Sequence, residues 1–238
     1  MKALQPFLRD RSCEVLINLM TRHIIRFLDE ENRAESYEKL FGRPGVLNSL
    51  RKVPKGPERT EEAVREYCRS LQDLCDFSYV SSAVIFEPDQ ESIRYFLVYG
   101  TNHSRGIEVF KEAETMTSRT QDLVRHGARS LTSGQDEWDF GDDSVKSRLT
   151  YKLRERYTGR ARAKVVELLR RSGSSGVLYS ELFCEAMAFP LVTPDDLQSW
   201  IEALAPNVRL ELAGSSRRRR PSPAQKDRVV VMNRTKLV

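Results

Sequence analysis

The sequence predicts a mixed α/β protein in two parts, a larger α/β part and then a smaller part of short helices and strands. Two strand-like runs at 77–86 and 92–99, joined by a polar turn, predict an antiparallel hairpin. A short apolar, β-branched run at 14–19 predicts one more strand, and helical periodicity dominates the segments between. The predicted division is an α/β domain over 1–130, an acidic linker over 131–147 and a second domain over 148–238.

Composition excludes several classes of protein. The 238 residues are 39% hydrophobic and 31% charged, which is enough apolar material for a core. No apolar run approaches the ~20 residues of a membrane-spanning helix, and the first residues lack the apolar stretch of a signal peptide. The four cysteines form no CxxC motif, so neither a metal site nor a disulfide framework is indicated. We therefore expect a cytoplasmic protein that makes no membrane contact.

The net charge of +5 is unevenly distributed. Residues 150–174 contain eight basic and two acidic side chains, and residues 215–238 contain eight basic and one acidic, so the remainder carries −8. Clustered Lys and Arg displace counterions from phosphate, which predicts a nucleic-acid partner for the basic C-terminal region; the alternative is a solvated surface. The candidate phosphate-binding residues are Arg160, Arg162, Lys164, Arg217, Arg218, Arg219 and Arg220.

The first part begins with a short predicted helix at 1–10. The run at 14–19 suits a strand buried on both faces, as in a parallel sheet. Helices are predicted at 21–31 and 34–41, the second ended by Gly42, and a loop at 43–58. A helix from Thr60 to Cys75 places Cys68 and Cys75 on its apolar face, where we expect core residues rather than a redox pair.

The hairpin leads into a helix that should continue to about residue 130. Ile107, Phe110, Ala113 and Met116 are expected to form its packed face. The following segment, 131–147, is acidic and suits a linker; the alternative is an ordered loop packed by its two aromatic residues, Trp138 and Phe140.

The second part has the element order of a winged helix-turn-helix. The pattern predicts a helix at 162–171, a strand at 177–179, helices at 181–188 and from Thr193 to 204, and strands at 208–212 and 228–232. The third helix contains no Lys or Arg and would repel DNA, so phosphate contacts would fall to the basic loop before the last strand and to the first helix. Such contacts imply backbone binding without base readout. The alternative is a winged helix that contacts protein.

Three segments, CEVLINLMTRHIIRFL, KLFG and IRYFLVYGTNHSRGIEVFKEAETM, resemble the three-Cys-motif partner proteins (TcmP), a bacterial family of methyltransferase-like proteins. The resemblance covers roughly residues 1–120. It implies the C-terminal part of a Rossmann-like, class I methyltransferase sheet followed by a winged helix. Residues 14–19 would be the fifth, parallel strand of that sheet, and the hairpin its sixth and seventh strands.

The resemblance also implies motifs that this chain does not contain. A Gly-rich loop for S-adenosylmethionine, an acidic residue after the second strand and an Asp-Pro-Phe-Gly type motif should all precede Met1. We therefore expect Met1 to be an internal methionine, or the chain to be a natural half-protein that pairs with a separate N-terminal half. No catalytic, cofactor-binding or metal-binding residue is assigned, and S-adenosylmethionine is expected only for a full-length protein. Expected partners are that missing half or a three-Cys-motif protein.

Four polar residues remain as a candidate site. Asn102, His103 and Arg105 follow the second strand of the hairpin, where His103 would titrate near neutrality and Arg105 would bind phosphate. The alternative is a strand-to-helix turn capped by Ser104. Asn18 lies within the apolar run at 14–19 and is either a functional amide or a satisfied buried one.

Overall fold

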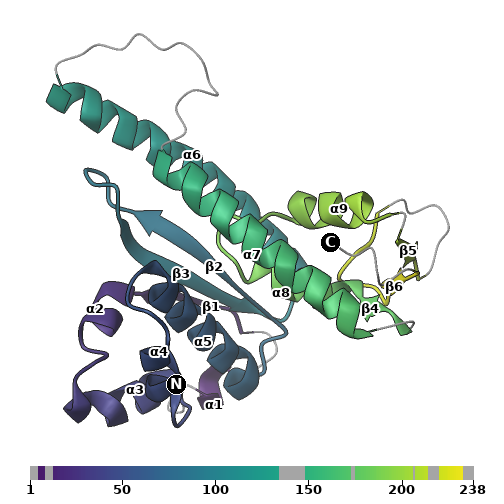
Figure 1. Cartoon of the computed structure of the whole chain (residues 1–238), viewed down its shortest axis with the longest axis horizontal. Coiled ribbons are helices and arrows are strands. Elements are labelled where there is room, and N and C mark those ends of the chain that lie inside the picture. Colours follow the sequence, from purple (N-terminus) through teal and green to yellow (C-terminus); the bar gives the residue numbers. More distant parts are fainter. Residues whose placement is uncertain are drawn as a thin grey trace.

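The computed structural model describes residues 5–8, 13–133, 148–172, 175–205, 207–213 and 220–232, with backbone alone at 31 and over 126–133. The described chain is a mixed α/β structure with two small antiparallel sheets (Figure 1). Its first part contains α1 (Gln5–Leu8), β1 (Val15–Leu19), α2 (Thr21–Arg26), the 3₁₀ turn η1 (Glu31–Arg33), α3 (Ala34–Phe41), α4 (Val46–Lys52), α5 (Pro57–Cys75), β2 (Tyr79–Phe86), β3 (Ile93–Thr101) and α6 (Ser104–Ser133). Its second part contains α7 (Arg148–Ser172), β4 (Val177–Leu178), α8 (Tyr179–Met187), α9 (Pro194–Ala203), β5 (Val208–Glu211) and β6 (Arg228–Val231).

The predicted hairpin forms the larger part of the first sheet. β2 and β3 pair antiparallel from Tyr79 opposite Thr101 to Ile85 opposite Tyr95, with an irregularity beside Phe86. β1 lies on the other side of β3, so the strand order is β1-β3-β2. Because both outer strands are antiparallel to β3, β1 and β2 run in the same direction.

The prediction for 14–19 is correct in type but wrong in environment. β1 pairs antiparallel with β3, Val15 opposite Gly100 and Leu19 opposite Phe96, and no parallel pairing occurs among the described strands. Exposure alternates along β1: Leu16 is 61% exposed and Asn18 is also exposed, whereas Leu19 is buried. Among the described strands β1 lies at the edge of the sheet, and its alternating exposure leaves one face open, which an apolar run alone does not reveal.

Between β1 and β2 the chain is more helical than predicted. The expected loop at 43–58 contains α4, which buries Val46, Leu47 and Leu50. The end of α3 is as predicted, because Gly42 adopts the left-handed conformation (φ 71°) that glycine tolerates best. Cys68 and Cys75 are buried core residues on α5, as expected.

α5 and α6 both contact β2 and β3 and lie on opposite sides of this sheet (Figure 1). The prediction for the packed face of α6 is only partly right. Ile107 is buried, but Ala113 and Met116 are exposed. The side chains that α6 does bury are mostly polar or charged: Lys111, Glu114, Ser118, Asp122 and Arg125.

In the second part, α7 is much longer than the predicted helix at 162–171. It buries a stripe with a spacing of four residues, Leu153, Tyr157, Ala161, Val165 and Leu169, and runs beside α6 (Figure 1). The second sheet has the order β4-β6-β5, with Val177 opposite Val229 and Val208 opposite Val231.

The predicted start of α9 is confirmed. The Thr193 hydroxyl accepts from the Asp196 backbone N–H, and the Asp196 carboxylate accepts in return from the Thr193 backbone N–H, which completes a capping box ahead of Pro194. Buried apolar side chains of both parts form one continuous cluster, from Leu8 to Val231. Most of the predicted linker, with Trp138 and Phe140, lies outside the described residues.

Candidate functional site: the junction between the two parts

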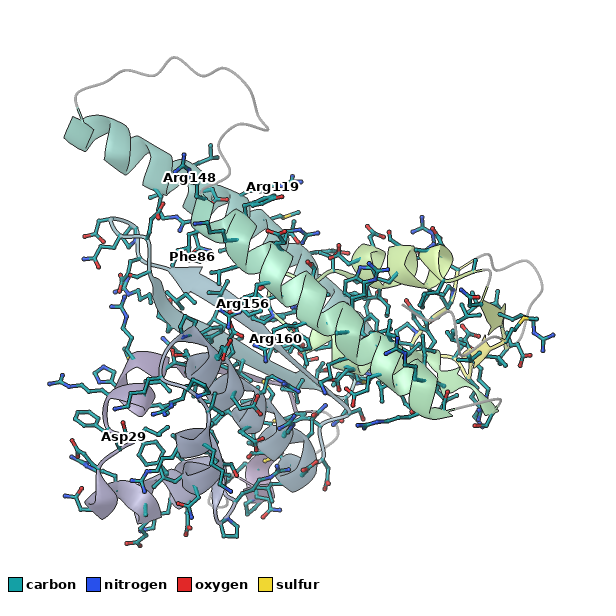
Figure 2. All side chains as sticks on the ribbon, viewed as in Figure 1. Asp29, Phe86, Arg119, Arg148, Arg156 and Arg160 are labelled. Atoms are coloured by element: carbon teal, nitrogen blue, oxygen red, sulfur yellow. The ribbon has the colours of Figure 1, made fainter. Side chains whose placement is uncertain are left out.

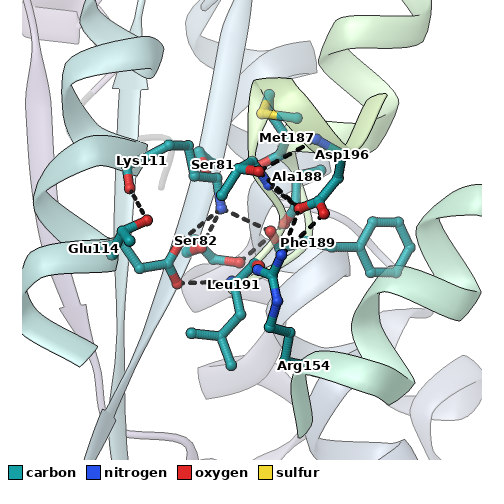
Figure 3. Close-up of polar contacts among 12 residues, drawn as sticks. Ser81, Ser82, Lys111, Glu114, Arg154, Met187, Ala188, Phe189, Leu191 and Asp196 are labelled. Atoms are coloured by element: carbon teal, nitrogen blue, oxygen red, sulfur yellow. Dashed lines mark hydrogen bonds and ion pairs between the residues drawn. The ribbon is translucent and has the colours of Figure 1, made fainter. Parts of the chain in front are cut away.

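The C-terminal end of α8 docks against β2 and α6. The Ser81 hydroxyl donates to the Met187 carbonyl (2.6 Å), and the Ser82 hydroxyl donates to the Ala188 carbonyl (2.9 Å) (Figure 3). The Lys111 ammonium donates to the next carbonyl, that of Phe189, at 2.7 Å. The last carbonyls of a helix lack intrahelical partners and form the negative end of its dipole. Two hydroxyls and one ammonium group from the first part therefore provide hydrogen-bond donors for the free carbonyls at a helix end in the second part.

Lys111 and Glu114 form a buried ion pair at the centre of this junction. Lys111 is 1% exposed, and its ammonium also donates to Glu114 Oε2 (2.9 Å) and to the Ser82 carbonyl (3.2 Å). Glu114 Oε1 accepts from the Leu191 backbone N–H (2.9 Å). Burial lowers the pKa of Lys111, and the neighbouring Glu114 opposes that effect. Because all three ammonium protons have acceptors, the arrangement is that of a structural lysine rather than a free base.

Arg154 fixes α7 to the start of α9. Its guanidinium donates to the Leu191 carbonyl (2.5 Å) and to both carboxylate oxygens of Asp196, at 2.9 and 3.2 Å (Figure 3). Asp196 is also the acidic member of the capping box. Its carboxylate therefore both caps α9 and binds Arg154 of α7. A two-pronged contact of this kind sets direction as well as distance.

An ionic contact between the two parts involves Glu61 of α5. Its carboxylate is 6% exposed and pairs with Arg156 (Nε to Oε1, 3.1 Å) and with Arg160 of α7. Figure 2 labels these two arginines. Tyr157 lies between these two arginines in sequence, is 1% exposed, and has no hydrogen-bond partner for its hydroxyl among the described residues. Burial is the main cause of its raised pKa.

An open cleft of about 460 Å³ lies between the two parts, lined by α5, the start of β2, α7 and α8. Its arginines are engaged: Arg65 pairs with Glu62, and Arg69 pairs with Glu66. Cys68 and Cys184 both line the cleft, and burial raises the pKa of each thiol to about 12. Such thiols stay protonated at neutral pH, so neither is an activated nucleophile.

The structure does not bring the predicted polar site together. Asn102 Oδ1 accepts from the backbone N–H (2.8 Å) and hydroxyl (3.1 Å) of Ser78, and so joins the ends of the hairpin. His103 is exposed, and Arg105 pairs with Glu108 (2.8 Å) within the first turns of α6. Asn18 lies opposite Leu97 of β3. Because Leu97 is five residues before Asn102, Asn18 and Asn102 are about 16 Å apart along the sheet. The strand-to-helix turn is the better interpretation of 101–106.

Three of the four described candidate phosphate-binding residues lie in ion pairs. Arg160 is used in the pair with Glu61, and Lys164 pairs with Glu167 (2.7 Å). Arg162 is exposed on α7. Arg220 is exposed and lies 3.8 Å from Asp195 of α9. Arg217, Arg218 and Arg219 lie outside the described residues.

Sequence reasoning missed the buried charges of α6. Besides Lys111 and Glu114, Asp122 and Arg125 pair with each other, and the Thr150 hydroxyl of α7 donates to Asp122 Oδ1 and accepts from Arg125 Nη2 (both 2.7 Å). Arg125 also stacks over the Phe86 ring, 4.3 Å from its centroid. The available signal was spacing: with Ser118 between the two pairs, these buried polar residues recur at intervals of three and four, like a helix face that packs.

The described part of the chain contains no cluster of three or more His, Cys, Asp or Glu side chains able to hold a metal ion. Within it, no helix is long and apolar enough to cross a membrane. Comparisons of the chain with family models, curated protein sequences and solved structures return no match.

The described strands do not fit S-adenosylmethionine, the cofactor implied by the resemblance. Open α/β sheets bind nucleotides in a crevice at the carboxyl ends of neighbouring parallel strands, where the strand order reverses. Here β1 and β2 run in the same direction but are separated by the antiparallel β3. Near the carboxyl ends of β1 and β2, the Arg22 guanidinium donates to Glu87 (3.0 Å) and to the Ser92 hydroxyl (2.7 Å).

Proposed function

We propose that this chain is the C-terminal part of a methyltransferase-like protein of the three-Cys-motif partner type. By itself the chain is inactive. Its first part holds a winged-helix module in a fixed position for a partner. The observation that carries the proposal is the strand order β1-β3-β2. In a class I methyltransferase sheet the seventh strand is inserted, antiparallel, between the fifth and the sixth. The order β1-β3-β2, in which β3 is antiparallel to both neighbours, supports this assignment.

The edge of β1 is where a missing half would join. Within the described chain β1 pairs only with β3, and its outward residue Leu16 is 61% exposed. An unpaired strand edge with apolar side chains is a template for another strand. A separate N-terminal half, or a three-Cys-motif protein, is the partner we propose. S-adenosylmethionine would bind only once such a half supplied the adjoining parallel strands.

The order of elements from α7 to β6, with the sheet order β4-β6-β5, supports a winged helix for the second part. Its third helix, α9, exposes Asp195 and Glu202 and contains no basic residue. That surface disfavours insertion into a DNA groove. Several basic residues of α7 are used inside the molecule, which leaves protein contact as the role best supported.

Calorimetric titration of S-adenosylmethionine into the folded chain tests the proposal. We expect no heat of binding at ligand concentrations up to about 100 µM, well above the Kd of a micromolar site. Hydrogen exchange provides a second readout, because amides of the edge strand β1 should exchange faster than those of β3, which is paired on both sides. Micromolar binding of the cofactor, or equal protection of β1 and β3, would refute the proposal.

Nucleic-acid binding through the winged helix is the second candidate. It is favoured by the exposure of Arg162 and Arg220 and by the basic run in the sequence that ends at Arg220. Contacts of this kind would bind the phosphate backbone without regard to sequence.

Retention of duplex DNA over a salt series tests this candidate. Replacing Arg162 and Arg220 by serine should lower the slope of log K against log salt by about 0.9 for each phosphate that the protein no longer neutralises. The matched control replaces Lys39 and Lys55, which are 74% and 79% exposed in the first part, and removes the same charge. If the unmodified chain does not bind at low salt, or if both double variants change the slope equally, this candidate fails.

A further inference from the structure

α6 is amphipathic, but its polar face points into the molecule and its apolar face points outward. Its inward face is made largely of the charged and polar residues described above, whereas its outward face carries Val109, Met116 and Leu123, which are 49%, 70% and 57% exposed. We call these three residues the outer seam of α6. Monomeric proteins rarely keep a contiguous apolar strip in water, so such a strip is typical of an interaction surface.

The spacing of the outer seam is that of a helix-packing surface. Its members are seven residues apart, which keeps them on one side of the helix over about 21 Å. The exposed residues Ala113 and Thr120 lie beside them, and neither is large enough to prevent close approach of a second helix. The surface therefore suits a single helix lying along α6.

Two charges next to the seam indicate which helix that is. Glu112 and Arg119 are both exposed and lie four residues before and three residues after Met116. In a parallel pair of α6 helices, Glu112 and Arg119 of the two copies would stay seven residues apart, about 10 Å along the axis, so the opposite charges would not meet. In an antiparallel pair centred on Met116, Glu112 of each copy would lie beside Arg119 of the other, and Val109 beside Leu123. The sequence of this face is self-complementary in the antiparallel direction, as a two-fold interface requires.

We propose that two copies of this chain associate through antiparallel packing of their α6 helices, with the two-fold axis at Met116. The inward charges of α6 do not compete for this contact, because Lys111 pairs with Glu114 and Arg125 with Asp122 inside each copy. A single helix pair covers less area than a standard stable interface, so the dimer forms reversibly in the micromolar range. The contact uses a surface separate from the edge of β1 and does not rest on the function proposed above.

Sedimentation velocity over a concentration series reaching about 100 µM measures the association. The unmodified chain is expected to shift from monomer to dimer across the series. Met116→Arg should remain monomeric at every concentration, whereas Met232→Arg, which changes a methionine of similar exposure (66%) in the second part, should dimerise like the unmodified chain. A chain that stays monomeric throughout, or two variants that behave alike, would overturn the proposal.

Charge reversal tests the direction of the helices. Glu112→Arg alone and Arg119→Glu alone should each weaken the dimer at least tenfold, because each places like charges together twice across the axis. The double variant, Glu112→Arg with Arg119→Glu, should restore the original affinity. If the double variant is as weak as the singles, the antiparallel arrangement is wrong.

Cysteine cross-linking gives an independent geometric readout, in a background where the partly exposed Cys13 and Cys184 are replaced by serine. Met116→Cys should form a disulfide-linked dimer by itself. Val109→Cys and Leu123→Cys should form none when oxidised separately and should cross-link when the two variants are mixed. Cross-linking of Val109→Cys with itself would indicate parallel helices and would contradict the proposal, as would no cross-link in any combination.

Discussion

At the scale of the residue, burial decides the role of each polar side chain. Lys111, Glu114 and Glu61 are all nearly inaccessible, and each has charged or hydrogen-bonding partners from the other part of the chain. A buried charge is tolerated only when it is paired, and removal of its partner costs several kcal/mol. By contrast His103, a candidate from sequence, is exposed at a turn. Residue type alone does not distinguish a buried, paired polar side chain from an exposed one.

Tyr157 provides a prediction at this scale. Its hydroxyl is buried without a hydrogen-bond partner among the described residues, and an unsatisfied buried group costs about 1–3 kcal/mol. Tyr157→Phe should therefore leave the free energy of unfolding in urea unchanged or raise it by about 1 kcal/mol. The matched control is Tyr37→Phe, since the Tyr37 hydroxyl donates to the Ile24 carbonyl and its loss should lower stability by about 1 kcal/mol. Equal losses in both variants would show that Tyr157 is hydrogen-bonded in solution.

At the scale of the element, local signals predicted helix and strand type well and burial poorly. Caps and turn residues act through the neighbouring backbone, so the end of α3 at Gly42 and the start of α9 at Thr193 follow from the sequence. The outward face of α6 was misassigned, because its apolar seam faces away from the sheet. α4 was missed because Pro, Gly and Lys on either side of it resemble a loop.

The capping box of α9 gives a prediction at this scale. Thr193→Ala removes the hydroxyl that accepts from the Asp196 backbone N–H, and loss of such a cap costs about 1 kcal/mol. Chemical denaturation should show this loss with an unchanged m-value. Thr158→Ala, within α7, removes a hydroxyl that bonds only to carbonyls of its own helix and should change stability by less than about 0.5 kcal/mol. A Thr193→Ala variant as stable as Thr158→Ala would mean that the cap is not formed.

At the scale of the whole molecule, the junction predicts that the two parts behave as one cooperative unit. Ser81, Ser82 and Lys111 hold the end of α8, Glu61 holds α7, and the apolar cluster is continuous across the junction. Parts joined by buried polar contacts as well as apolar ones are expected to unfold together. The winged-helix module proposed above would then keep one orientation relative to the first sheet.

Lys111→Met tests this cooperativity. The change leaves the Glu114 carboxylate buried without its cation and should lower the free energy of unfolding by about 3–5 kcal/mol. Urea unfolding is followed by far-ultraviolet circular dichroism and by fluorescence of Trp200 in α9, in a Trp138→Phe background. The two signals should coincide in the parent chain and separate in the variant, with the second part unfolding at a different urea concentration.

A second substitution controls for simple damage to the core. Lys111→Met combined with Glu114→Leu removes both charges and should recover part of the lost stability, because no uncompensated charge remains. A double variant less stable than Lys111→Met alone would contradict the assignment of the pair. So would a Lys111→Met variant within about 1 kcal/mol of the parent.

The sequence by itself determined the hairpin, the capped helix starts and ends, the core cysteines and the element order of the second part, because these depend on neighbours within a few residues. Only the tertiary structure decided that β1 is an edge strand within the described part of the chain, that Arg160 belongs to an internal ion pair, and that α6 turns its charges inward and its apolar seam outward. Those outcomes depend on which surfaces meet across long separations in the chain, and the same side chain is stabilising or costly according to the partner it meets there.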